Sequence, residues 1–108
     1  MKFNIYHAKK LANPFDMPEP ATDNYTLVGQ VDAADVEQAY LRTQNLGPEG
    51  WPLQSTTTKA LSERIRSTSV GDIILSEDGQ ASRIEMIGTK IVQFTPPSDE
   101  IADWSNKW

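Results

Sequence analysis

The feature that most constrains the fold of this chain is a block at residues 66–87, in which two apolar runs flank a tight turn. Hydroxyl residues at 67–69 lead into the apolar run at 73–75, and a second apolar run occupies residues 83–87. Between the two runs stands Asp78-Gly79, a pair that is typical of two-residue β-hairpin turns, because glycine accepts the backbone angles that such turns need. The block therefore predicts two paired strands that follow a hydroxyl-rich loop.

A two-residue loop at Asp78-Gly79 predicts the register of this hairpin. Ile73 then faces Ile84, and the apolar side chains of both strands share one face of the sheet. A three-residue turn that begins at Gly88 leads into a third strand, in which Phe94 is expected to lie opposite Ile84 as well. These three strands form an antiparallel meander with one apolar face, and such a face needs a cover.

Two further strands are predicted upstream, from residue type and the spacing of polar and apolar residues. They occupy residues 2–7 and residues 25–31, and Gly29 is a candidate β-bulge in the second of them. Prolines between the two strands remove backbone donors and fix φ, so residues 13–24 are predicted to form an irregular connector.

One helix is predicted over residues 33–41. Asp32 stands at the N-cap position, where its carboxylate can accept a hydrogen bond from a free backbone N–H, and Gly47 followed by proline is typical of a helix end. The helix face expected to pack on the sheet consists of Val36, Ala39, Tyr40 and Thr43. Residues 47–60 are predicted to be irregular, and residues 60–65 to form one helical turn.

These elements predict a single α+β domain at residues 1–98, in which a small antiparallel sheet of about five strands packs against one main helix. Residues 99–108 form an acidic tail, in which Ile101, Trp104 and Trp108 follow helical spacing. The tail either folds back to cover its own sheet or serves as an amphipathic docking peptide, which makes its two tryptophans candidate partner-binding residues.

The composition argues against several classes of protein. With 38% hydrophobic residues and no apolar run near the roughly 20 residues that span a bilayer, the chain is expected to be soluble and to have no membrane partner. The absence of cysteine fits a reducing cytoplasm, and no secretion signal is expected. A net charge of −5 argues against direct nucleic-acid binding, so the acidic residues either confer solubility or meet a basic partner.

The loop that precedes the hairpin is the main candidate for a binding site. Its guanidinium, hydroxyl and backbone N–H groups are the donors that an anion or a nucleotide phosphate needs. The candidate residues are Arg66, Ser67, Thr68, Ser69 and Asp72, together with the N–H of Gly71. Alternatively, the hydroxyls bond to backbone within the loop and Arg66 pairs with an acid such as Glu63. The loop lacks the glycine spacing and the lysine of a P-loop.

Three other features have both a structural and a functional interpretation. His7 is the only histidine in a chain without cysteine, so no metal site is predicted and a structural role is expected. Asp72 and Glu85 lie opposite each other in the predicted register, either as an acid–base pair or as solvated residues on the outer sheet face. Trp51 is either a hydrophobic plug beneath its loop or an anchor for a partner.

The sequence Arg-Ser-Thr-Ser-Val-Gly-Asp at residues 66–72, followed by a short hairpin, resembles the core of the YodL-like domain family. The upstream order is similar as well, with a strand that leads to a helix containing Glu37, and with a turn at Gly88 before the last strand. The resemblance covers roughly residues 25–94, and the chain departs from the pattern at Thr89, where the family has an aromatic residue.

This resemblance implies a small accessory protein of the kind that phages, plasmids and some bacterial chromosomes carry, without an established reaction. We therefore expect a non-enzymatic protein without a cofactor, which binds a host protein in the bacterial cytoplasm to counter defence or to redirect a host process. The alternative is a small-anion- or nucleotide-binding domain, or an enzyme, that uses the loop at residues 66–72.

Overall fold

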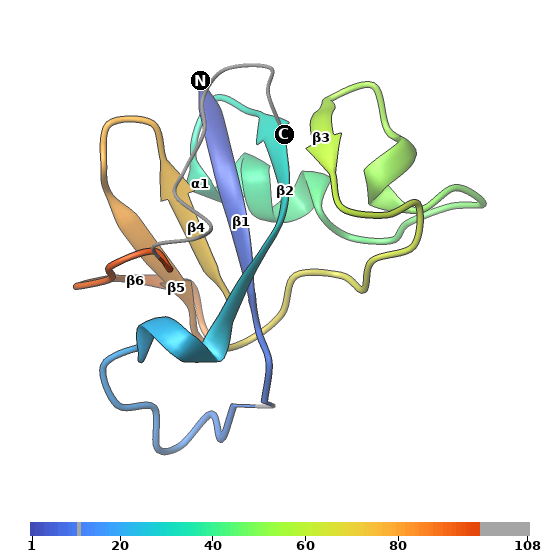
Figure 1. The fold of residues 1–108 in the computed structure, drawn as a ribbon. Helices are drawn as coiled ribbons and strands as arrows, with labels where there is room; N and C mark the ends of the chain where they lie inside the picture. The colour runs from blue at the N-terminus through green and yellow to red at the C-terminus, as the bar shows by residue number, and fades with distance from the viewer. Residues whose placement is uncertain (11, 98–108) are drawn as a thin grey trace.

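The computed structural model of the chain describes residues 1–10 and 12–97 (Figure 1). In chain order the elements are β1 (Lys2–Ala8), η1 (Thr22–Asn24), β2 (Tyr25–Asp32), α1 (Val36–Arg42), η2 (Trp51–Leu53), β3 (Thr57–Ala60), β4 (Ile73–Ser76), β5 (Ala81–Ile84) and β6 (Thr89–Val92), where η marks a short 3-10 helix. None of the helices in these two ranges combines the length and the hydropathy that crossing a bilayer requires.

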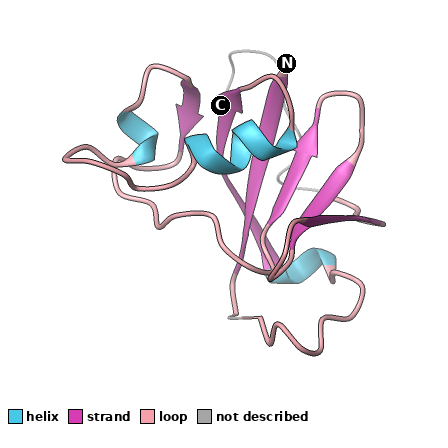
Figure 2. Ribbon diagram, turned by 180° about the vertical axis from the view of Figure 1, so that it is seen from behind, coloured by secondary structure: helices cyan, strands magenta, loops and turns pink. Residues whose placement is uncertain are grey.

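The strands form one antiparallel sheet of six strands in the order β3-β2-β1-β4-β5-β6. Helix α1 lies on one side of this sheet, behind the strands in Figure 1 and in front of them in the reverse view of Figure 2. The predicted α+β class is confirmed in this coarse form, although α1 has only seven residues and the sheet has one strand more than the sequence predicts.

The additional strand is β3, which lies at one edge of the sheet. Its last residue, Ala60, faces Gly29 of β2, so the prediction of an irregular stretch at 47–60 is wrong for its last four residues. The helical turn predicted at 60–65 is also wrong, because a bend follows the strand. Four residues are too short for an alternating pattern, and pairing with β2 decides their conformation.

The bulge predicted in β2 is confirmed beside Gly29. Ile5 of β1 faces Gly29, whereas the next residue, Tyr6, faces Leu27, so Val28 is the extra residue of β2. A bulge of this kind increases the local twist of the strand that contains it.

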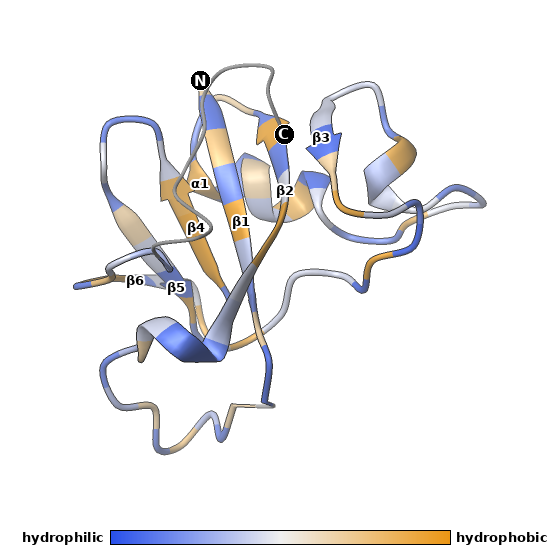
Figure 3. Cartoon of the chain, viewed as in Figure 1, coloured by the Kyte–Doolittle hydropathy of each residue, from blue (hydrophilic) through white to orange (hydrophobic). Residues whose placement is uncertain are grey.

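The sheet buries apolar side chains on both of its faces, so the core has two layers. The first face, on the side of α1, belongs to a cluster of Phe3, Ile5, Val31, Ala33, Ala39, Trp51, Ile74 and Ile84. The second face carries Tyr6, Tyr25, Leu27, Ile73, Leu75, Ala81 and Val92. In Figure 3, β4 is mostly apolar, as expected of a central strand that is buried on both faces. The neighbouring β1 is buried on both faces as well but alternates, because it buries polar side chains such as Asn4.

The predicted register of the β4–β5 hairpin is wrong by one residue. Ile73 faces Arg83 instead of Ile84, because the turn holds three residues, 77–79, rather than two. Gly79 closes the turn with a φ of 95°, which is the left-handed conformation that three-residue hairpin loops place at their last position. Since β4 is buried on both faces, its apolar pattern cannot distinguish between the two registers.

The predicted position of β6 is wrong for a similar reason. Thr89, and not Phe94, faces Ile84. Gly88 is the last residue of the turn, with a φ of 72°, so the strand begins at once instead of after a three-residue turn. Phe94 follows the end of the strand and is free to pack elsewhere.

The predicted N-cap of the helix and Gly47 as its terminating residue are wrong, although its last residue is predicted to within one position and its buried face is confirmed. Asp35 is the N-cap, and one of its carboxylate oxygens accepts a hydrogen bond from the backbone N–H of Gln38 at 2.8 Å. Asp32 still belongs to β2, where its N–H donates to the carbonyl of Thr56. The helix ends at Arg42, well before Gly47. The face predicted to be buried lies against the first-face cluster, with Ala39 and Thr43 fully buried and Val36 and Tyr40 partly buried.

The two aspartates before α1 provide a test of its start. Asp35→Ala should lower the free energy of unfolding by about 0.5–2 kcal/mol, because a backbone N–H of the first turn loses its acceptor. Asp32→Ala is the matched control, and its exposed side chain should change stability by less than about 0.5 kcal/mol. Urea denaturation measures the free energy of unfolding of both variants. A larger loss of stability in Asp32→Ala than in Asp35→Ala would show that Asp32 is the N-cap.

Candidate functional site

The loop at residues 66–72 is organised by an ion pair between Arg66 and Asp72. Nη1 of Arg66 lies 2.6 Å from Oδ2 of Asp72, and Nη2 lies 2.8 Å from Oδ1, so the contact is two-pronged. The carboxylate is fully buried, and it also accepts the backbone N–H groups of Ala8 and Ser69, each at 2.8 Å. The hydrogen bond to Asp72 raises the pKa of Arg66 above its ordinary value.

The predicted anion-binding donors of this loop are therefore engaged within the protein. Arg66 and the N–H of Ser69 both bind Asp72, and the N–H of Gly71 donates to the carbonyl of Ile84 at 2.9 Å. The hydroxyl of Ser67 accepts the N–H of Asn45 at 2.8 Å, and the hydroxyl of Thr68 contacts the ring of His7. An internal carboxylate occupies the position that an external anion would take.

The acidic residues of the hairpin also lie differently from the prediction. The acid that pairs with Arg66 is Asp72 and not Glu63, and Asp72 is buried rather than solvated. Asp72 does not face Glu85, because its carbonyl accepts the N–H of Ile84 at 2.9 Å. Glu85 instead pairs with Nε of Arg83 at 2.8 Å. The predicted carboxylate pair is therefore not present as a unit.

His7 is buried beside this ion pair. Its Nε2 lies 2.9 Å from Oγ1 of Thr68 and 3.8 Å from Oδ2 of Asp72. Burial lowers the pKa of His7 to about 4; the carboxylate of Asp72 opposes this change in part, and the charge of Arg66 adds to it. The ring is therefore neutral at pH 7 and links β1 to the loop, which is a structural role. Within the described ranges, no group of three or more His, Cys, Asp and Glu residues is placed to hold a metal ion.

Trp51, a predicted candidate anchor, is fully buried and does not present a surface to a partner. Its Nε1 donates to the carbonyl of Arg66 at 2.9 Å, and its ring packs against Gly29. A Cβ atom at Gly29 would lie 2.6 Å from the ring, so the glycine makes room for the tryptophan. Of the two predicted roles, Trp51 therefore has that of a hydrophobic plug: it is buried in the core and supports the loop at residues 66–72.

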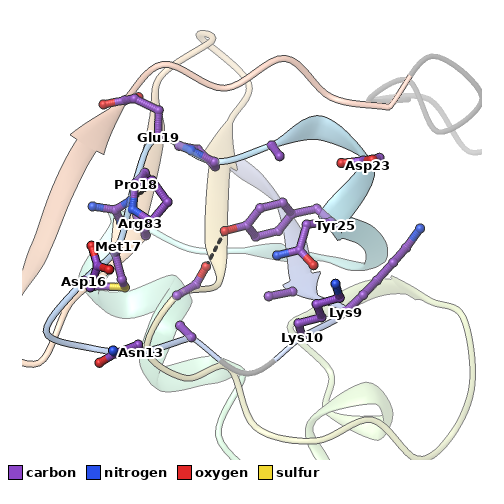
Figure 4. A pocket seen from close by; sticks show the side chains of 16 residues that line it. Lys9, Lys10, Asn13, Asp16, Met17, Pro18, Glu19, Asp23, Tyr25 and Arg83 are labelled. Atoms are coloured by element: carbon purple, nitrogen blue, oxygen red, sulfur yellow. Dashed lines mark hydrogen bonds between the residues drawn. The ribbon is translucent and has the colours of Figure 1, made fainter.

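A cavity of about 490 Å³ lies between the N-terminal connector and the end of the sheet (Figure 4). The hydroxyl of Tyr25 donates to the carbonyl of Gly71 at 2.7 Å, and Nη1 of Arg83 donates to the carbonyl of Pro18 at 2.7 Å. The remaining charged residues of the wall are Lys9, Lys10, Asp16, Glu19 and Asp23. Because this wall carries both signs of charge, it does not select a cation or an anion.

A groove of about 360 Å³ runs between α1 and the β5–β6 turn. Four exposed apolar residues, Leu41, Met86, Ile87 and Ile91, form what we call the groove surface. Leu41 and Met86 line the groove, and Ile87 is 94% exposed in the turn between Met86 and Gly88. Ile91 shares a sheet face with Thr89, another lining residue, because side chains alternate along β6.

Sequence reasoning did not identify the groove surface. Met86 belongs to the second apolar run, which is predicted to contribute to the apolar face of the meander, whereas the structure leaves it 58% exposed. The available signal was the pair Met86-Ile87 directly before Gly88, because two apolar residues in a tight turn are unusual. Trp104 and Trp108, the candidate anchors of the tail, lie outside the described residues.

Comparisons with protein-family models, with curated proteins and with solved structures find no match to this chain. The functional assignment therefore rests on the geometry described above and on the resemblance at residues 66–72.

The ion pair of the loop can be tested by substitution. Asp72→Ala should lower the free energy of unfolding by about 3–5 kcal/mol, because it leaves a guanidinium and two backbone N–H groups without their buried acceptor. Arg66→Lys retains the charge but cannot form the two-pronged contact of a guanidinium, so the free energy of unfolding should fall by about 1–2 kcal/mol. Glu63→Ala is the control and should stay within about 0.5 kcal/mol in urea denaturation. Equal effects of Glu63→Ala and Asp72→Ala would contradict the assigned pairing.

The buried His7 predicts a pH-dependent stability. Its pKa is about 4 in the folded chain against 6.5 for an ordinary histidine, so between these values the unfolded chain binds a proton that the folded chain does not. Stability should therefore fall as the pH drops below about 6.5, by about 3 kcal/mol in total for this group. Denaturation curves between about pH 7 and pH 5 measure the slope. His7→Gln should flatten it, and an unchanged slope would assign the effect to other groups.

Proposed function

We propose that this protein acts by binding another protein through the groove surface, rather than by catalysing a reaction. The observation that carries this proposal is a groove lined by Leu41 and Met86, both more than half exposed. Two further exposed apolar residues adjoin its lining residues in the chain or on the sheet face, namely Ile87 and Ile91. Apolar residues that gather in this way mark interaction sites, because burying them against a partner removes apolar area from water.

The arrangement of the sheet explains why this surface is open. Helix α1 makes its main contacts with β2 and β4, so it lies over the middle of the sheet. Thr89 and Ile91 of β6 point to the same side as α1 but are exposed. A partner segment that binds beside α1 would cover the exposed part of this sheet face, in the same layer as the helix.

The charges at the groove indicate the chemistry of that segment. Glu37 and Glu85 line the groove next to the apolar side chains, and Glu37 is exposed. The whole chain carries a net charge of −5. We therefore propose a partner segment with apolar side chains flanked by lysine or arginine, because complementary charges favour the encounter and suppress wrong partners.

The class of partner follows from the resemblance to the YodL-like domain family. We propose a host protein in the bacterial cytoplasm as the partner, and a mobile element of phage or plasmid type as the setting, with the purpose of countering defence or redirecting a host process. The alternative, a small-anion or nucleotide ligand or an enzymatic reaction at residues 66–72, has less support, because the donors of that loop already bind Asp72.

Site-specific photo-crosslinking tests the proposed surface. A photoreactive phenylalanine derivative in place of Ile87 should cross-link a defined host protein in bacterial cells, whereas the same group in place of Leu61 should not. Leu61 is the matched control, because it is 60% exposed and lies outside the groove surface.

The purified partner then allows a quantitative comparison. Ile87→Lys should weaken binding by about 2 kcal/mol or more in calorimetry, because it replaces an apolar anchor by a charge that repels a basic segment. The thermal stability of the chain should remain unchanged, since the side chain is 94% exposed. Cross-links of equal yield at positions 61 and 87, or unchanged affinity in Ile87→Lys, would reject the groove surface.

A further inference from the structure

Strand β6 forms one edge of the sheet, and no strand of the described residues pairs with its outer side (Figure 1). Thr89, Lys90 and Ile91 are exposed, and the apolar side chain of Ile91 is 66% exposed. At the opposite edge, β3 packs against η2, and three of its four residues are partly buried. The edge at β6 is therefore the more open of the two.

The hydrogen bonds of β5 determine which backbone groups of β6 point outward. Both backbone groups of Ile84 bond to the segment at residues 71–72, at 2.9 Å, so they face away from β6. Thr89 lies opposite Ile84, and this pair is therefore not hydrogen-bonded, which directs the N–H and C=O of Thr89 away from β5. Because the direction alternates along a strand, the N–H and C=O of Ile91 also point outward. Among the described residues, nothing pairs with these groups.

The side chains of β6 define the pattern of a segment that could pair with this edge. Thr89 and Ile91 lie on the first face of the sheet, on the same side as α1 and the groove, because Thr89 is opposite Ile84 of the first-face cluster. Lys90 lies between them on the second face and forms no ion pair with a described residue. A matching segment therefore has apolar residues at alternate positions, with an acidic or polar residue between them opposite Lys90.

We propose that the partner segment binds as an extended strand, antiparallel to β6 like the other strands of the sheet, and adds a seventh strand to it. This inference rests on the proposed function and specifies the conformation of the segment. An extended backbone bonds to the outward groups of Thr89 and Ile91, whereas a helix uses its backbone groups internally and would leave them to water. The alternate apolar side chains of the segment lie beside Ile91 and reach toward the groove, and its terminal lysine or arginine residues lie near Glu37 and Glu85.

A short peptide tests this pairing without the host protein. The probe is acetyl-Lys-Val-Glu-Val-Lys-amide, in which the two valines are placed to pair with Thr89 and Ile91, and the glutamate with Lys90. In NMR titrations of the full chain, saturable shifts should centre on the backbone amides of Thr89 and Ile91, and hydrogen exchange of both amides should slow. The peptide acetyl-Lys-Glu-Val-Val-Lys-amide has the same composition without the alternation, and it should bind more weakly.

Methyl groups on the peptide backbone distinguish strand pairing from apolar contact alone. In the proposed antiparallel pair, the N–H groups of both valines point to β6, whereas the N–H of the glutamate points to solvent. N-methylation of both valines should weaken binding about tenfold or more, because two backbone donors are lost. N-methylation of the glutamate is the matched control and should have little effect. Equal effects of the two modifications would overturn the proposal.

Ile91→Pro supplies the corresponding change in the protein. Proline lacks the N–H that Ile91 directs outward, and edge strands tolerate proline at such a position, so the melting temperature should be retained while the peptide-induced shifts are lost. Ile91→Val keeps both the N–H and a branched apolar side chain, and it should bind the peptide as the unmodified chain does. Peptide binding that is unchanged in Ile91→Pro would contradict the pairing.

The remaining outcomes separate this inference from the proposed function. Peptide binding that is lost in Ile87→Lys but insensitive to N-methylation of the valines would retain the groove surface and overturn the strand. An absence of peptide binding would overturn the strand as well, while cross-linking from position 87 tests the groove surface independently. Slow exchange of the Thr89 and Ile91 amides in the free chain would show that the edge is already occupied. Slow exchange that requires high protein concentration would assign the edge to a second copy, and slow exchange at every concentration would assign it to the chain itself; both overturn the proposal.

Discussion

The buried carboxylate of Asp72 is the constraint on which the rest of the structure depends. It stands directly before β4, and it is satisfied by Arg66 and by the backbone N–H groups of Ser69 and Ala8. A carboxylate in the interior is stable only when its charge is paired and its oxygen atoms are hydrogen-bonded. The chain must therefore bring the end of β1 and the loop at residues 66–69 to one point, and this ties the central strands to the irregular segment between β3 and β4.

Side chains on the first face of the sheet also form hydrogen bonds with this loop. The carbonyl of Arg66 accepts the indole N–H of Trp51, and the hydroxyl of Thr68 contacts the buried ring of His7. These two polar groups of the loop thus have partners that belong to the core or to β1. This explains why a stretch with the donors of an anion site forms a structural joint instead, because its own carboxylate already occupies the centre.

The open groove surface follows from an imbalance between sheet and helix. Six strands bury apolar side chains on two faces, whereas the described residues provide one α-helix, of seven residues, to cover them. On the first face the helix leaves β6 open, which creates the groove surface. On the second face Phe94 packs edge-on against Tyr6 and Tyr25. A sheet of this kind gains stability from a segment that completes its open layer.

The sequence by itself determined the local features: strands where residue type and spacing favour them, a turn at Asp78-Gly79, the buried face of the helix, and a plug or anchor at Trp51. Only the tertiary structure decided the register of the hairpin, the pairing of Arg66 with Asp72 and the exposure of Met86. The physical reason is the same in each case. Central strands that are buried on both faces lose the alternation that records register. An ion pair depends on where the chain reverses, and exposure depends on which layer lies above a residue, so neither is encoded in the spacing of neighbouring residues.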